Sequence, residues 1–214
     1  MRFSIFLLIF ALTCSFSNAG EYRISFDPES FKNQWKSKGL GKKSKYTPIN
    51  IENEWVLKAE SHSGATGVGR ELPNDLLDKY PWINFSWKIE KDLINVDPRI
   101  KDQHDFSARL LIIDAKRITG SRIVSISHSN SIKDEDLPFT QISPWTRSSR
   151  DHVISNKTNG GEWMSFKLDA KALMKKLHNF KSFKGKFVLA VFVDGNNSKQ
   201  HVISYFKDIY FSSE

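Results

Sequence analysis

Cysteine is almost absent from this chain of 214 residues, because Cys14 is the only one. A single cysteine cannot close a disulfide within the chain, and it cannot supply a zinc–thiolate site. An apolar core must therefore stabilise the fold, and a chain of this length can bury one as a single domain. The 16 phenylalanines and 6 tryptophans supply large apolar side chains for it.

Several motifs of catalytic and metal sites are also missing. The sequence holds no GxSxG, which excludes the nucleophile elbow of the α/β-hydrolases. The six histidines show no HxH or HExxH spacing, so no metal site is predicted. Residues 39–44 resemble a phosphate-binding loop, but the first glycine is missing and Lys43 stands where Ser or Thr belongs. We therefore expect no cofactor.

Long apolar runs occur only at the N-terminus, where they predict an export signal. Arg2 supplies a positive start, residues 3–16 form an apolar run, and residues 17–19 (Ser-Asn-Ala) suit a signal peptidase. We expect cleavage after Ala19, which leaves one β-sandwich domain at 20–214. No later segment reaches 18 apolar residues, so no transmembrane segment is predicted.

The export signal has a second interpretation, in which the protein is a lipoprotein acylated at Cys14. The preceding residues 11–13 (Ala-Leu-Thr) fit the usual leucine-then-small pattern poorly. In both interpretations the protein acts outside the cytoplasm, either in the periplasm or fully secreted.

Acidic residues are fewer than basic ones, and the formal net charge is +8 at pH 7. The basic residues concentrate at 36–45, which we expect to be exposed and mobile, and at 171–186. Outside the cytoplasm such charge suits an anionic polysaccharide, lipid headgroups or another anionic envelope polymer, not nucleic acid. The alternative is a basic surface that only keeps the protein soluble.

Short β-rich runs between turn signals predict a mostly β protein, specifically a jelly-roll-type antiparallel β-sandwich. Residues 187–193 are apolar throughout, which predicts a central strand covered on both faces. The expected strands are 22–26, 55–60, 67–72, 83–89, 106–113, 122–127, 152–155, 163–168, 187–193 and 202–211.

One amphipathic helix is expected in the last third of the chain. Asp169 is a suitable N-cap, and the apolar positions that follow recur at helical spacing. We expect this helix to cover a sheet. Its apolar positions are Ala170, Leu173, Met174, Leu177 and Phe180.

Three stretches together resemble a bacterial exported family known as domain of unknown function 3047. The first covers residues 57–88, with Leu-Lys-Ala-Glu-Ser at its start and Tyr-Pro-Trp-Ile-Asn-Phe-Ser-Trp-Lys at its end. The second is 97–109, similar to the family's "DxRxKxGDDFxAR". The third combines 194–197 with 205–209, similar to "DxDNT…YxGDI".

The chain departs from this family pattern at several positions. Gln103 and His104 replace a Gly-Asp pair, Asn196 replaces an Asp, and Lys207 replaces a Gly. Two carboxylates are thereby lost, which would weaken an acidic site. The strand layout also resembles galactose-binding-type jelly-roll modules, which implies a fold but does not determine a function.

Asp105 and Arg109 are the first candidates for a ligand site. Arg109 lies in an otherwise apolar expected strand, so its guanidinium needs a partner. Asp105 is an even number of residues away and falls on the same face, but about 13 Å along the strand. Arg109 therefore either pairs with a carboxylate on a neighbouring strand or opens onto a cleft where it binds ligand.

Asp194 and Asn196 belong to an Asp-Gly-Asn-Asn sequence that is first of all a turn. The alternative is a polar rim that binds sugar or Ca²⁺. Trp145 lies in a polar, basic loop, where its ring could stay accessible for stacking on a sugar.

These features favour a non-catalytic binding module for an extracytoplasmic glycan or anionic envelope polymer. One alternative is a polysaccharide-acting enzyme, a hydrolase or lyase, that uses paired carboxylates such as Asp105 and Asp194. Another is a structural envelope protein, which would need an exposed apolar patch.

Overall fold

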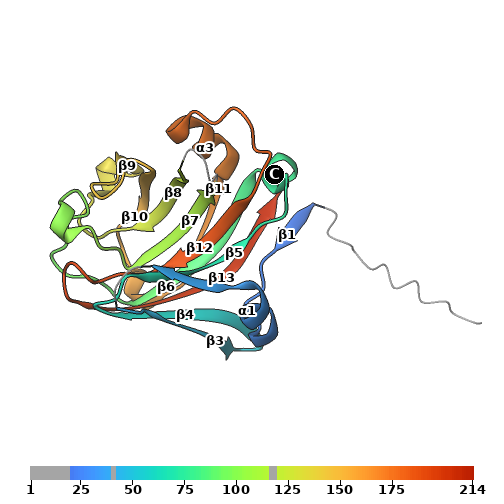
Figure 1. Ribbon diagram of the computed structural model, residues 1–214. Coiled ribbons are helices and arrows are strands. Elements are labelled where there is room, and N and C mark those ends of the chain that lie inside the picture. Colours follow the sequence, from blue (N-terminus) through green and yellow to red (C-terminus); the bar gives the residue numbers. More distant parts are fainter. Residues whose placement is uncertain (1–19, 40–41, 116–119) are drawn as a thin grey trace, which may run out of the picture.

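Two β-sheets packed face to face form the body of the protein (Figure 1). The computed structural model describes residues 20–39, 42–115 and 120–214. Its strands are β1 (Glu21–Arg23), β2 (Lys36–Gly39), β3 (Lys45–Ile51), β4 (Glu54–His62), β5 (Thr66–Glu71), β6 (Trp82–Lys91), β7 (Ala108–Asp114), β8 (Arg122–His128), β9 (Phe139–Ile142), β10 (Ser149–Ser155), β11 (Met164–Asp169), β12 (Phe187–Phe192) and β13 (His201–Ser212).

The strand order is that of a jelly-roll-type sandwich. Sheet A has the order β11-β6-β13-β4-β3, with β1 pairing along β13, and sheet B has the order β2-β5-β12-β7-β8-β10-β9. Every pair is antiparallel except β8 with β10, which is parallel. The fold expected from the sequence is confirmed, with sheet B being mixed.

Alternating side chains of the two sheets fill the space between them. Leu57 of β4 faces the core from sheet A, while Leu110 of β7 and Leu189 of β12 face it from sheet B, and all three are fully buried. Each such side chain stabilises the fold by about 1.5–3 kcal/mol. A second, small apolar cluster of Phe106, Ile132 and Val153 lies apart from this core.

The helices are short and lie at the margins of the sheets. Asp169 caps α3 as expected, because its carboxylate accepts a hydrogen bond from the backbone N–H of Ala172 at 2.7 Å. Figure 1 places α3 near the ends of β7 and β8, away from β3 and β4. The α-helices are α1 (Pro28–Gln34), α2 (Leu76–Lys79) and α3 (Ala170–His178), and three short 3-10 helices are η1 (Lys101–Gln103), η2 (Asp134–Asp136) and η3 (Asn159–Gly161).

Ten strands lie where the sequence predicted them, with small shifts at their ends, and three were not predicted. β2 and β3 occupy parts of the segment 36–45, where no strand was predicted, and the lysines of this segment are exposed as expected. β2 pairs with β5, and β3 pairs with β4. A lysine on an edge strand keeps its charge in water while the strand's backbone pairs with its neighbour. Such a strand lacks the apolar alternation that would predict it from the sequence.

Two further expectations need correction. β12 is central, between β5 and β7, but only its inward face is fully covered, while Val188 and Phe192 are only partly buried on the other face. β7 begins at Ala108, so Asp105 and Phe106 precede the strand and do not extend it.

The expected signal peptide, 1–19, lies outside the described residues. Within those residues, no helix has the length and apolar character needed to span a bilayer.

Candidate functional site

A groove of about 750 Å³ runs across the outer face of sheet B. Its walls and floor come from β2, β5, β12 and β7, whose strand register places one residue of each strand side by side. One such row across the sheet is Lys38, Gly67, Phe192 and Arg109; the next is Lys36, Gly69, Ala190 and Leu111.

Small residues on the central strands make room for the groove. Gly67 and Gly69 of β5 and Ala190 of β12 add little or no side chain to this face, and the side chains of Leu111, Ile113 and Val188 complete an apolar floor. Gly67 is also required by packing, since a Cβ there would lie 2.5 Å from Cδ2 of Phe192.

The rim of the groove is polar and basic. Lys36 and Lys38 extend from the edge strand β2 and are exposed. Arg70 of β5 also lines the groove, but it lies opposite the core residue Leu189, and its Nη2 donates a hydrogen bond to the Tyr22 hydroxyl of β1 at 2.8 Å, away from the rim. Glu71 is the acidic member of the lining and pairs with Lys186 at 3.4 Å.

The other half of this outer face is covered. The apolar cluster of Phe106, Ile132 and Val153, joined by Leu137 and Phe139, packs over β8 and β10. Beneath this cover His104 and the buried Asp151 form a 2.7 Å pair. This cover therefore limits the groove to the β2–β7 half of the sheet.

Arg109 is held in a buried ion pair beside the groove. Its Nη2 contacts Oδ2 of Asp194 at 2.5 Å, and its guanidinium lies between the rings of Phe106 and Phe192, 4.5 and 4.8 Å from their centroids. The sequence allowed Arg109 either to pair with a carboxylate of a neighbouring strand or to bind a ligand in a cleft. In the structure it pairs with the carboxylate of Asp194, in the turn after β12. Because Phe192 lines the groove, Arg109 supports the groove wall through that ring.

The two candidate carboxylates are buried next to each other and are bonded to backbone groups. Asp194 accepts a hydrogen bond from the N–H of Phe106 at 2.9 Å, and Asp105 accepts from the N–H groups of Asn197 and Ser198 at 3.2 and 2.6 Å. Burial raises the pKa of Asp194 to about 6; Arg109 opposes this rise and Asp105 adds to it. The carboxylates thus fasten the turn after β12 to the segment before β7.

Asn196 and Trp145 lie outside this ion-pair network. Asn196 is in the turn, where its side-chain amide donates to Oδ1 of Asn197 at 3.0 Å and its carbonyl accepts from Lys199. Trp145 is 52% exposed and its ring lies 4.7 Å from Nζ of Lys101. Neither residue lines the groove, so the five candidates do not form one site.

Sequence reasoning missed the groove because its residues carry no chemical motif. The available signal was the pair of glycines in Gly67-Val68-Gly69, which fall on one face of a strand and add no side chain to it. The neighbouring run 187–192 looked fully buried because Val188 and Phe192 are apolar, although both line a surface groove. Only the register between β5 and β12 brings these positions together.

Two solved structures align with the protein over most of its length. The structure aligns with the family 11 carbohydrate-binding module of the cellulosomal cellulase Lic26A-Cel5E of Clostridium thermocellum at 13% identity and TM-score 0.44, covering 85% of this chain and 88% of that one. It also aligns with the xyloglucanase domain of NopAA, a type three effector from Sinorhizobium fredii, at 12% identity and TM-score 0.48, covering 84% and 93%.

No curated protein sequence matches the chain. The family model of proteins of unknown function, DUF3047, matches residues 33–210. That span includes all three stretches that carry the resemblance in the sequence and most of both sheets. The chain belongs to the DUF3047 family.

Proposed function

We propose that this protein is an exported, non-catalytic binding protein that holds an anionic glycan in the groove of sheet B. The observation that carries the proposal is the pairing of an apolar floor with the basic side chains of Lys36 and Lys38 on one rim. Ligand sites are typically concave and mostly apolar, with a few polar groups that fix orientation. The C–H faces of sugar rings suit such a floor, and acidic substituents suit lysine and arginine.

Arg109, Asp105 and Asp194 have a supporting role in this proposal. Burial and hydrogen bonding engage both carboxylates, so we assign them to holding the groove wall and not to acid–base chemistry. Trp145 lies in another loop, and we propose no contact between it and the ligand.

Binding of sodium polygalacturonate, with a neutral β-glucan for comparison, tests the proposal by calorimetry or affinity electrophoresis. Polygalacturonate should bind, and its affinity should fall steeply with salt, since the Debye length shrinks from about 10 Å at 0.1 M to about 3 Å at 1 M. Lys36→Gln with Lys38→Gln should weaken binding. Lys175→Gln with Lys176→Gln removes equal charge from exposed positions on α3 and should leave binding unchanged.

A second variant tests the floor of the groove. Ala190→Phe should fill the floor and abolish binding, provided that its far-UV and near-UV circular dichroism match those of the parent protein. Binding of the neutral glucan alone would reject the anionic ligand but keep the groove as a glycan site. Binding of sodium palmitate in preference to either glycan would identify an acyl-chain site instead, and release of reducing ends would identify an enzyme.

A further inference from the structure

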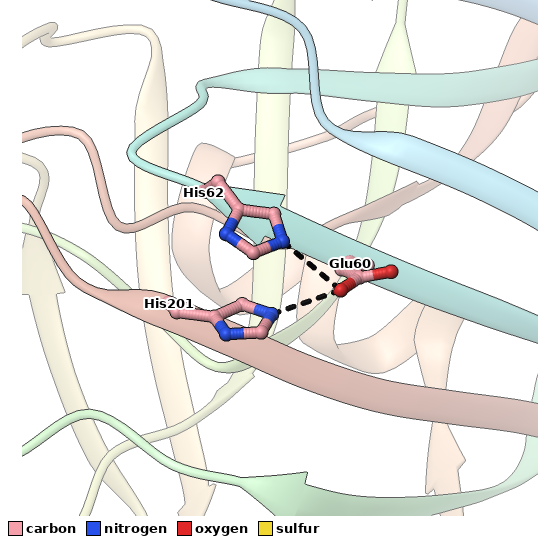
Figure 2. Close-up of side chains that lie close together, drawn as sticks. All are labelled: Glu60, His62 and His201. Atoms are coloured by element: carbon pink, nitrogen blue, oxygen red, sulfur yellow. Dashed lines mark hydrogen bonds and ion pairs between the residues drawn. The ribbon is translucent and has the colours of Figure 1, made fainter.

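Two histidines and a glutamate converge on the outer face of sheet A, on the opposite side of the sandwich from the groove. Glu60 and His62 are two residues apart on β4, so their side chains share a face. His201 begins β13 and lies directly opposite His62 in the antiparallel ladder. Figure 2 shows both imidazole rings turned toward the Glu60 carboxylate.

The three side chains present their ligand atoms to one another at short range. Nε2 of His62 and Nε2 of His201 lie 3.0 and 2.9 Å from the same oxygen, Oε1 of Glu60. The imidazole rings are stacked, with centroids 3.7 Å apart and an interplanar angle of 21°. One ligand atom from each residue lies within 4.8 Å of the other two.

These separations are close to those of a metal site. Ligands about 2.0–2.2 Å from a tetrahedrally coordinated zinc ion lie about 3.4 Å from one another. Small side-chain rotations would therefore bring the three atoms to coordinating positions. His62 is 59% exposed in its side chain, so an ion can reach the cluster from solvent.

The backbone around the cluster is held in place independently of the three side chains. Between Glu60 and His62, the buried Ser61 bonds through its hydroxyl to both N–H and C=O of Gly64. The N–H of Ser63 donates to the carbonyl of Gln200 at 3.1 Å, which ties the end of β4 to the start of β13. The positions of the two histidines relative to each other are thus set by the fold.

We infer that Glu60, His62 and His201 form a binding site for a divalent transition-metal ion such as Zn²⁺. Two imidazole nitrogens and one carboxylate oxygen suit zinc, copper(II), nickel and cobalt, whereas calcium and magnesium prefer sites made of oxygen alone. The sequence concealed this site because His62 and His201 are far apart in the chain, and Glu60-Ser61-His62 is not a recognised metal motif.

Lys91 lies beside the proposed metal site and should oppose metal binding. Its Nζ lies 3.2 Å from Nδ1 of His201, so in the absence of metal Nδ1 accepts from Lys91 and Nε2 donates to Glu60. When an ion takes the lone pair of Nε2, the ring proton moves to Nδ1, and the Lys91 contact must open. Lys91 also places a positive charge beside the incoming cation. Lys91→Met should therefore bind metal more tightly than the parent protein.

The experiment is a calorimetric titration of ZnCl₂ into untagged protein, together with the visible spectrum after loading with Co²⁺. One ion should bind per chain, and zinc should raise the melting temperature by mass action. His62→Ala, His201→Ala and Glu60→Gln should each lower the affinity by more than about 100-fold, since even residues that only orient ligands cost 10–100-fold. His62 is the safest of the three to replace, because it is largely exposed.

Matched controls separate coordination from general electrostatics. Glu90→Gln removes a carboxylate that is bonded to the Tyr205 hydroxyl, and His178→Ala removes a histidine on α3; neither should change the affinity for zinc. Absence of saturable zinc or cobalt binding would overturn the inference. So would unchanged affinity in His62→Ala, which would place the ion elsewhere. The affinity for polygalacturonate should not change in any of these variants, so each of the two proposals can be rejected without the other.

Discussion

Replacing Arg109 by methionine is the change that most directly tests how this half of sheet B is stabilised. The substitution keeps an apolar side chain at this position but removes the guanidinium that lies between Phe106 and Phe192. Asp194, which is only 4% exposed, then keeps its hydrogen bond from the N–H of Phe106 but loses its ion-pair partner. Breaking a buried pair by removing one partner costs about 3–5 kcal/mol, because an uncompensated charge is left behind.

The size of the loss should depend on pH. Burial is the largest cause of the raised pKa of Asp194, and Arg109 is the largest influence that lowers it. Without Arg109, the carboxyl becomes neutral at a higher pH, and the neutral form avoids the cost of a buried charge. The destabilisation measured by chemical denaturation should therefore be largest at high pH and should shrink as the pH falls towards 6, below which the carboxyl is neutral in both proteins.

Two further variants make this prediction specific. Arg109→Met combined with Asp194→Asn should recover much of the lost stability, because no charge remains buried. Arg99→Met breaks an exposed pair with Asp97 and should cost no more than about 1 kcal/mol. A loss below about 1 kcal/mol for Arg109→Met, or a double variant that is the least stable of all, would refute the reasoning.

Three other predictions have defined outcomes. Asp194→Asn should remove a pH dependence of stability. The pKa of Asp194 is raised to about 6 in the folded protein against 3.8 in the unfolded chain, so the protonated carboxyl favours folding at low pH, and this contribution of up to about 3 kcal/mol is lost as the pH rises through 6. Parallel curves of unfolding free energy against pH for variant and parent from pH 4 to 7 would contradict this prediction. Gly67→Ala should destabilise the protein by about 1–3 kcal/mol, because the new Cβ overpacks against Phe192. Gly69→Ala should cost less, since its Cβ would lie 3.1 Å from its nearest neighbour, Cγ1 of Val188. Thermal melts that rank the two variants in the opposite order would show that the Phe192 ring moves aside. Mass spectrometry of the processed protein should find Gly20 as the first residue, and retention of Met1 would remove the basis for export.

Local pattern was enough to predict most of the fold. Short β-rich runs between turn residues, several of them alternating with period two, predicted ten of the thirteen strands in the described residues. The three missed strands are β2, β3 and β9. β2 is exposed at every position and β9 is four residues long, and both form sheet edges where burial leaves little trace in the sequence.

The candidate sites were predictable only in part. Arg109 stood out because an arginine within an apolar run needs a partner, and the partner is one of the two carboxylates singled out with it. The groove and the histidine–glutamate cluster were not predictable, because both depend on the residues opposite one another in neighbouring strands. A register shift of one residue would send His201 or Phe192 to the other face of its sheet.

By itself the sequence determined the predominance of β structure, the capped helix at Asp169, and the membership in DUF3047, since these depend on residues close together or on whole stretches of pattern. Tertiary structure alone decided which half of sheet B stays open, because loops from distant segments bury Phe106 and Val153 on the other half. It also decided that Glu60, His62 and His201 meet. Strand pairing is a long-range choice made by the whole core, and side-chain clusters on the outer faces follow from it.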